Sequence, residues 1–395
     1  MKVETITQPT GLQLPILLDE TGLPVPIYNE FILSRANLQT NTLIRNSYEL
    51  SIFDEWIKSR NEQFLELYVK GLVGEAVING SLVPWLRKSF DKNPKLKKLF
   101  LSPDTFNERL TTVRLFLNWH FNVVSGKMSY LSNEFKVLKE SNARVESLLT
   151  SAYVKSIPVK KSVSLGLTLN QVQDLIHCVD PENPNSYGRN YAVKYRNYVM
   201  VLLMLGCGMR PGELLSLKVD DVQHGAYPAI DVVRRPPDKK DTRRMKPNIK
   251  RNGRLLPIYD PNIAFHLDQY LVEYRDEFEE RAKTPSEYLF LSDEGRPLSL
   301  KSVGEYFRII RSRHSDVLPE NITAKSLRHT FSSNLLKGLK ESGLEEEQRT
   351  KILAILRGDT NLASQDRYTV QVYNDFASTY MRRYQRSLVF EEVPF

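Results

Sequence analysis

Cysteine and histidine are scarce in this chain of 395 residues, which holds two cysteines and six histidines. A tetrahedral structural zinc site needs four closely spaced thiol or imidazole ligands, and these few scattered residues do not supply one. Both cysteines, Cys178 and Cys207, have apolar neighbours in the sequence. We therefore expect two buried thiols in a reducing compartment.

Long apolar runs are also missing. No stretch approaches the roughly 20 apolar residues that a membrane-spanning helix needs. The first ten residues, MKVETITQPT, lack the apolar core of a secretion signal. The sequence therefore predicts a cytoplasmic protein without a membrane partner.

Basic residues are in excess, with 55 Lys and Arg against 47 Asp and Glu and a formal net charge of +8. This balance indicates a polyanionic partner such as nucleic acid. The chain is too long for one ordinary core, so we expect two domains.

The N-terminal part is predicted to contain three segments. Residues 1–26 are rich in Pro, Gly and Thr and predict an extended arm or a weak hairpin. Residues 27–150 space their apolar positions as helices do, which predicts a helical domain with Lys and Arg on its outer faces. Residues 151–167 show no periodicity and carry Lys155, Lys160 and Lys161. They predict a basic linker suited to a path along phosphates.

The remaining chain predicts a second domain, residues 168–385, with a tail at 386–395. Thr168 has the pattern of a helix cap, and a long apolar helix follows around YRNYVMVLLMLGCGM. The runs IDVV and RLLPI interrupt the helical pattern between residues 230 and 258 and predict a small antiparallel sheet. The predicted fold class is therefore mainly α with a small antiparallel β-sheet, an α+β protein.

Charged residues interrupt the apolar stretch LGCGMRPGELLSL. Arg210 follows the pair Gly206 and Gly208, where a buried helix ends, and Pro211 suits the first turn of the next helix. Glu213, three residues further on, can hold the guanidinium in place. One interpretation is a functional cation that faces out of an apolar wall, and the alternative is a buried ion pair that only fixes the packing.

Two further elements carry residues of the same kind. The segment ITAKSLRHTFSSNLL places Lys325 and Arg328 one helical turn apart at a helix start. Arginine binds phosphate oxygens with two parallel hydrogen bonds, so cations from separate elements can converge on one phosphate. Tyr368 lies in the polar stretch GDTNLASQDRY, whereas a core tyrosine usually has apolar neighbours.

Together, GMRPGELLSL, KSLRHTF and GDTNLASQDRY resemble the three sequence boxes of the tyrosine recombinases, the phage integrase family, over about residues 165–385. The resemblance implies a helical core-binding domain at 27–150 followed by the catalytic domain of that family. It also implies that Arg210 and Arg328 bind the scissile phosphate of DNA, that Glu213 supports them, and that Tyr368 is the nucleophile.

The same resemblance assigns two further positions. Lys325 stands where the family has His or Lys, and Asp359 stands where it usually has His or Trp. An ionised aspartate there would repel a phosphate. Asp359 is then neutralised by Arg357 or another cation, acts only structurally, or reduces activity. We expect activity to be retained, because two arginines, a lysine and the tyrosine are all present.

A lysine on a β-hairpin acts in this family as the general acid for the leaving 5′-oxygen. The segment IKRNGRLLPI resembles that hairpin, which favours Lys250, with Lys246 and Lys239 as alternatives. Residues 231–254 hold ten basic residues against three acids. They form either a solvated loop or, as we expect beside this site, a DNA contact. The residues expected to bind DNA are Lys155, Lys160, Lys161, Arg243, Arg244, Lys246 and Arg251.

The resemblance therefore predicts a site-specific recombinase or integrase that cuts and rejoins duplex DNA through a 3′-phosphotyrosyl bond, without metal or cofactor. It also predicts a monomer in solution that forms a homo-tetramer on DNA recombination sites, with C-terminal segments exchanged between neighbours. The alternative for the C-terminal tail is that it folds back on its own domain. The alternatives are a type IB-like topoisomerase and a DNA-binding accessory protein of the same fold with impaired chemistry. A metal-dependent nuclease using Asp220 and Asp221, and Tyr373 as a rival nucleophile, are less favoured by the pattern.

Overall fold

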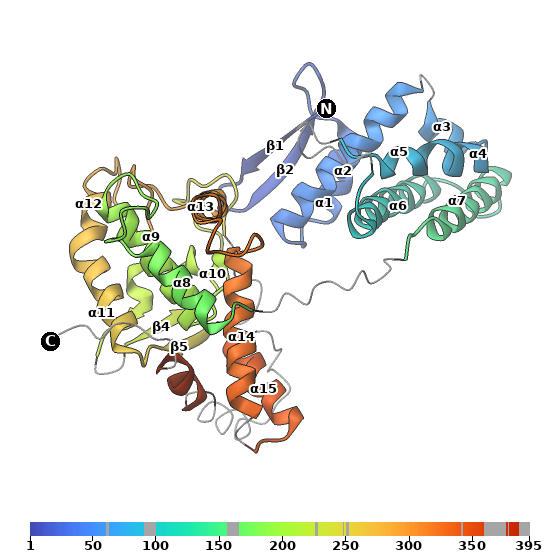
Figure 1. Cartoon of the computed structure of the whole chain (residues 1–395). Helices are drawn as coiled ribbons and strands as arrows, with labels where there is room; N and C mark the ends of the chain where they lie inside the picture. Colours follow the sequence, from blue (N-terminus) through green and yellow to red (C-terminus); the bar gives the residue numbers. More distant parts are fainter. Residues whose placement is uncertain are drawn as a thin grey trace. The chain divides into compact units, whose positions relative to one another are not determined.

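The computed structural model describes residues 1–60, 63–90, 100–155, 166–225, 228–247, 249, 253–340, 343–358, 377 and 379–386. The chain divides into two compact units, Met1–Lys160 and Lys161–Phe395 (Figure 1). The division falls within the segment predicted as a linker. Each unit has its own apolar core. None of the helices in the described ranges is long and apolar enough to cross a membrane.

A hairpin opens the first unit. Strand β1 (Lys2–Thr7) pairs antiparallel with β2 (Gln13–Leu18), with Val3 opposite Leu17. Leu14 and Leu17 are buried. The Asn29 side chain accepts a hydrogen bond from the Leu17 N–H at 2.8 Å and donates to the Leu17 carbonyl at 2.9 Å. Of the two structures predicted for residues 1–26, the chain therefore forms the hairpin, and the hairpin contributes to the core of this unit.

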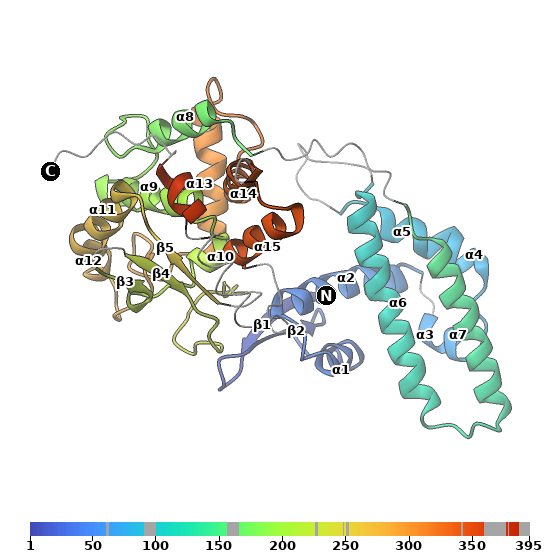
Figure 2. The same ribbon diagram turned by 90° about the horizontal axis from the view of Figure 1, so that it is seen from below.

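Helices make up the rest of the first unit, as predicted for residues 27–150. They are α1 (Pro26–Ser34), α2 (Thr40–Ser59), α3 (Phe64–Val69), α4 (Glu75–Val77), the π-helical turn η1 (Ile78–Leu82), α5 (Val83–Arg87), α6 (Pro103–Ser125) and α7 (Asn133–Ser151). Helices α6 and α7 lie side by side (Figure 2). The side chains of Ser102 and Ser132 cap their N-termini. The core between the helices is aromatic, and the rings of Trp56 and Phe64 meet edge to face at 5.0 Å.

The described ends of the predicted linker are packed against the two units. At the first end, the Val154 N–H donates to the Asn107 side chain at 3.1 Å, and Lys155 is exposed. At the second end, the Leu167 N–H donates to the Thr330 hydroxyl at 2.8 Å. Lys160 and Lys161 lie outside the described residues.

The second unit is built around a buried helix, α9 (Tyr191–Gly206), which contacts α8, α11, α12 and α14. The other helices are α8 (Leu169–Val179), α10 (Pro211–Leu214), the 3₁₀ turn η3 (Val219–Asp221), α11 (Pro261–Gln269), the π-helical turn η4 (Tyr270–Tyr274), α12 (Arg275–Glu279), α13 (Leu300–Arg313), α14 (Ala324–Lys340) and α15 (Glu346–Arg357). Thr168 caps α8 in a capping box with Gln171, as its sequence pattern predicts.

The predicted small sheet is present. Strands β3 (Val222–Gln223), β4 (Ala229–Val232) and β5 (Arg254–Pro257) form an antiparallel sheet in that order. Ile230 lies opposite Leu256, and Val232 lies opposite Arg254. We call residues 233–253, between β4 and β5, the basic excursion. Helix α15 contacts β5, and this contact brings the end of α15 to the start of the strand.

Residues 379–386 form the last described helical segment. The Tyr384 hydroxyl donates to the Leu205 carbonyl at 2.9 Å. The buried Gln385 side chain donates to the carbonyls of Gly206 and Pro257 and accepts a hydrogen bond from the Tyr259 N–H at 2.6 Å. This segment therefore ties the end of α9 to the end of β5. Residues 387–395, the greater part of the predicted tail, lie outside the described residues.

Both cysteines are buried, as the sequence predicts. Burial raises the pKa of the Cys207 thiol to about 12. Burial and the negative charge of nearby Asp174 raise the pKa of the Cys178 thiol to about 11. The two thiols are therefore protonated at neutral pH and act as apolar core groups.

Candidate active site

A tight turn between α9 and α10 positions the first predicted site residue. Gly208 adopts a left-handed conformation with φ of +61°, and a Cβ atom there would lie 2.2 Å from a ring carbon of Phe331. Glycine is therefore required both by the backbone and by the space. Arg210 follows as the N-cap of α10, with Pro211 in the first turn. The predicted helix break and helix start are confirmed, although α10 is only four residues long.

Glu213 is the centre of a cluster of three arginines. Its side chain is 2% exposed. Its carboxylate accepts hydrogen bonds from the Arg210 N–H at 2.9 Å and Nη1 at 2.6 Å, and from Arg254 Nη1 and Nη2 at 3.2 and 3.0 Å. Arg328 Nη1 lies 3.8 Å from the same carboxylate. Burial favours the protonated acid, but the Arg254 and Arg210 interactions outweigh it and lower the pKa of Glu213.

The arginines also bind the C-terminal end of α15. Arg328 Nη2 and Arg210 Nη1 donate to the Arg357 carbonyl at 2.7 and 3.4 Å, and Arg254 Nε donates to the Leu356 carbonyl at 2.8 Å. The last carbonyls of a helix lack partners within the helix and carry partial negative charge. Gly358, with φ of +61°, ends the helix there. The structure thus brings Arg210 and Arg328 together, from the N-cap of α10 and the start of α14.

The cluster carries an excess of positive charge. Three guanidiniums surround one carboxylate, and Arg210 is the most accessible of them, with 26% of its side chain exposed against 8% for Arg254 and Arg328. Burial and the nearby cations Lys325, Arg357 and Arg328 lower the pKa of His329. Lys325 is exposed in the first turn of α14. This arrangement suits an anionic ligand that reaches the cluster beside Arg210.

Several predicted site residues lie outside the described residues. These are Asp359, Tyr368, Lys250 and Arg251. Asp359 directly follows Gly358, and Tyr368 follows that glycine by ten positions in the sequence. Their assigned roles stay predictions.

Arg254 is a site residue that sequence reasoning missed. In the sequence it is one of the ten basic residues of the hairpin region, but it lies on β5 with its guanidinium paired to Glu213. One signal in the sequence could have indicated this position. Arg254 opens the β-type run RLLPI, and a charged residue that is buried beside an apolar run is typically paired.

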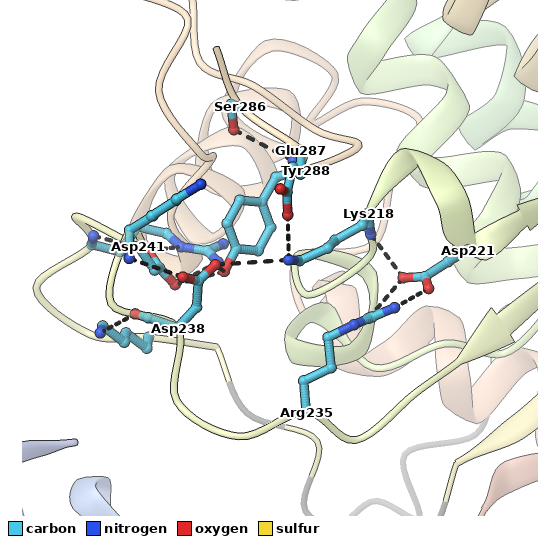
Figure 3. Close-up of polar contacts among 11 residues, drawn as sticks. Lys218, Asp221, Arg235, Asp238, Asp241, Ser286, Glu287 and Tyr288 are labelled. Carbon is cyan, nitrogen blue, oxygen red and sulfur yellow. Dashed lines mark hydrogen bonds and ion pairs between the residues drawn. The ribbon is translucent and has the colours of Figure 1, made fainter. Parts of the chain in front are cut away.

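The basic excursion folds back on the second unit through a cluster of ionic contacts (Figure 3). Arg235 forms a two-bond ion pair with the buried Asp221, which also accepts a hydrogen bond from the Lys218 N–H at 2.8 Å. Arg243 binds Asp241 through Nε at 2.9 Å and Nη2 at 2.8 Å. No group of three or more metal-ligating side chains is found within the described ranges.

Arg243, which was predicted to contact DNA, is held by internal contacts in this structure. Its guanidinium is buried and also donates to the carbonyls of Leu215 and Leu298 at 2.7 and 3.0 Å. Arg243 therefore fixes the excursion to the unit. Arg244 is exposed, and Lys246 is half-buried with its ammonium 2.6 Å from the Asp238 carbonyl.

Comparisons with known proteins show which proteins this chain resembles. The model of the phage integrase family matches residues 166–345. The tyrosine recombinase XerA of Thermococcus kodakarensis is 26% identical over 59% of this chain and 65% of its own length, slightly less than two thirds of that protein. The tyrosine recombinase XerC of Rickettsia typhi is 21% identical over 90% of this chain and 95% of its own length.

A solved structure shares the fold. The integrase of transposon Tn1549, determined in complex with circular intermediate DNA, matches with a TM-score of 0.51 and 18% identity, over 90% of this chain and 98% of the other. At this level of identity the likeness shows a shared fold. The part of the chain at residues 166–345 is therefore similar to the phage integrase family, the tyrosine recombinases.

Proposed function

We propose that this chain is a site-specific DNA recombinase that cuts and rejoins one strand at a time through a covalent bond to Tyr368. The observation that carries the proposal is the convergence of Arg210 and Arg328 on one point, held by Glu213 and by the end of α15. Phosphodiester cleavage develops negative charge on the non-bridging oxygens, and fixed guanidiniums stabilise that charge without having to reorganise.

In the proposed reaction, the Tyr368 oxygen attacks phosphorus and the bond from phosphorus to the 5′-oxygen breaks. The tyrosine hydroxyl loses its proton, and the leaving 5′-oxygen gains one from a hairpin lysine, for which Lys250 remains the choice. Lys325 would donate to a phosphate oxygen. The products are a 3′-phosphotyrosyl bond and a free 5′-hydroxyl. A 5′-hydroxyl of another strand can reverse the step, because the phosphotyrosyl bond conserves the energy of the cut bond.

In this proposal, Arg357 and the cations near it neutralise the charge of Asp359. The Arg357 carbonyl accepts hydrogen bonds from two arginines, and its side chain lowers the pKa of His329 from nearby. Asp359 follows Arg357 by two positions in the sequence, and in this proposal the nearby cations neutralise its charge as a source of repulsion, so that activity is retained.

Duplex DNA is the proposed partner, with four chains assembled on a pair of recombination sites. The cations proposed to meet phosphates outside the arginine cluster are Lys155, Lys160, Lys161, Arg244, Lys246 and Arg251. Arg244 and Lys155 are exposed, which supports their assignment. DNA partners of the solved Tn1549 integrase support duplex DNA as the ligand class.

A trapped covalent adduct tests the chemistry. The substrates are duplexes of randomised sequence, each nicked close to the cleavage position. Cleavage releases a short fragment that diffuses away, so the strand cannot be rejoined and the protein stays covalently bound to the DNA. We expect mass spectrometry to identify the adduct on Tyr368, in EDTA as well as in metal-containing buffer. Tyr368→Phe should abolish it, and the matched variant Tyr373→Phe should retain it. An adduct on another residue, or cleavage that needs a divalent metal, would overturn the assignment.

Two control experiments separate this proposal from its rivals. The wild-type chain would be an accessory protein if it bound duplex DNA but formed no covalent adduct with any of the randomised duplexes. Mixing Tyr368→Phe with Arg210→Ala tests whether chains cooperate. If each chain works alone, as in a topoisomerase, the mixture stays inactive, whereas exchange of segments between neighbours in an assembly can restore cleavage.

A further inference from the structure

The hydroxyl of Tyr288 joins two carboxylates of the basic excursion. It donates to Asp238 Oδ2 at 3.1 Å and to Asp241 Oδ2 at 3.3 Å (Figure 3). Tyr288 itself lies outside the excursion, between α12 and α13, and is buried. Two carboxylates, 50 and 47 positions before Tyr288 in the sequence, therefore meet at one oxygen atom. We call Asp238, Asp241 and Tyr288 the carboxylate clamp.

Cations around the clamp make the approach of two carboxylates possible. The Arg243 guanidinium lies 4.4 Å from the centre of the Tyr288 ring while binding Asp241. Lys218 Nζ lies 3.8 Å from Asp238 and 2.6 Å from Glu287. Like charges this close repel each other unless opposite charges neutralise them. Burial raises the pKa of Tyr288, so that its hydroxyl keeps the proton that it shares between the two acids.

Those cations of the excursion that the structure describes fall into two groups. Arg235, Arg243 and Lys246 point inward, where they bind Asp221, Asp241 and the Asp238 carbonyl. The outward group is exposed and consists of Arg234, Lys239, Lys240 and Arg244. A long loop without such anchors would have to be ordered when a ligand binds, and the entropy of ordering would weaken the binding.

We infer that Tyr288 is a positioning residue for DNA binding. Its hydroxyl holds Asp238 and Asp241 together, and the outward group is thereby ordered as a phosphate-binding surface before duplex DNA arrives. The inference rests on the proposed function for its ligand, duplex DNA, and not on the covalent step. Tyr288 thus has a role in DNA binding although it is not part of the arginine cluster.

Removing one oxygen atom tests the inference. Tyr288→Phe deletes the shared hydroxyl and keeps the ring against Arg243. The matched control is Tyr270→Phe, which deletes another buried hydroxyl of the same unit, one that donates to the Leu289 carbonyl at 3.1 Å and does not touch the excursion. Both changes are made in the Tyr368→Phe background, so that only binding is measured.

The readout is the affinity for duplex DNA at several salt concentrations. Each phosphate contact contributes about 0.9 to the slope of log affinity against log salt. We expect Tyr288→Phe to lower that slope by about two, as ordered contacts of the outward group are lost, and to weaken binding about tenfold at low salt. Hydrogen exchange of residues 234–247 in the free protein should become faster. Tyr270→Phe should leave the slope and this exchange unchanged.

A second variant tests whether the hydroxyl acts through the outward group. Changing all four outward cations to glutamine should lower the slope by itself. Adding Tyr288→Phe to that variant should then have no further effect on it. The inference would be overturned if Tyr288→Phe lowered the salt slope equally with and without the four outward cations. It would also be overturned if Tyr288→Phe changed neither the slope nor the hydrogen exchange. Binding without any tyrosyl adduct in the wild type would instead overturn the proposed chemistry alone, and a wild type that does not bind duplex DNA would overturn both.

Discussion

Glu213 and Arg254 form a buried pair with two parallel hydrogen bonds, of 3.2 and 3.0 Å, between their planar groups. The third donor of Arg254, Nε, reaches the Leu356 carbonyl at 2.8 Å. One guanidinium therefore connects the carboxylate that orients Arg210 to the helix end that binds Arg328. A lysine offers a single point charge in place of this fork and cannot make both connections.

Replacing Arg254 should consequently lower both stability and cleavage. Arg254→Ala leaves a buried carboxylate without its main partner, and breaking such a pair costs about 3–5 kcal/mol. Arg254→Lys keeps the charge and should fall between wild type and alanine in the free energy of unfolding measured with urea. Single-turnover cleavage of the nicked duplex should drop in both variants. A lysine variant equal to wild type in both measurements would contradict this role.

The lowered pKa of Glu213 predicts how its contribution depends on pH. Its folded pKa lies below the ordinary value of 4.5 because Arg254 and Arg210 outweigh the effect of burial. The stabilisation is therefore complete above about pH 4.5 and is lost as the pH falls through the folded value. The free energy of unfolding of wild type should exceed that of Glu213→Gln at pH 7, and the gap should narrow below pH 4.5. A gap of constant size between pH 7 and pH 3 would contradict the ionised buried carboxylate.

Sequence patterns predicted the parts of the site that depend on local spacing. Gly208 and Pro211 mark a helix end and a helix start, and the three-residue step from Arg210 to Glu213 matches the observed hydrogen bonds. Arg328 was placed correctly at the start of a helix. Each of these features depends on neighbours within one or two turns, which is the range over which sequence periodicity carries information.

Long-range pairing could not be predicted in the same way. Arg254 pairs with a carboxylate 41 positions earlier, and Arg243 binds carbonyls from two distant segments, Leu215 and Leu298. A count of basic residues treats these two arginines and the exposed Arg244 alike. Only the tertiary arrangement decides which cation is buried with a partner and which remains available to a ligand.

Gly208 offers a test of the turn that presents Arg210. Gly208→Ala puts an L-residue in the left-handed region, which costs about 1–2 kcal/mol, and forces overlap with Phe331, which costs about 1–3 kcal/mol. The variant should unfold at lower urea and cleave more slowly, because the Gly208 carbonyl also accepts a hydrogen bond from Arg328 at 2.7 Å. The control is Gly304→Ala in α13, where a Cβ would meet nothing within 4 Å. That change should stabilise the chain by up to about 1 kcal/mol, and destabilisation of equal size in both variants would refute the argument.

Adjacent arginines in the basic excursion provide a matched pair with opposite expectations. Arg243→Gln removes the partner of the buried Asp241 and two carbonyl contacts, so its free energy of unfolding should fall by about 3–5 kcal/mol. Arg244→Gln changes an exposed side chain and should leave the free energy of unfolding within about 0.5 kcal/mol. The order reverses for DNA: in the folded proteins, Arg244→Gln should reduce the salt slope of duplex binding by about one phosphate contact. If Arg244→Gln instead destabilised the fold and left the slope intact, the division of the excursion into inward and outward cations would be wrong.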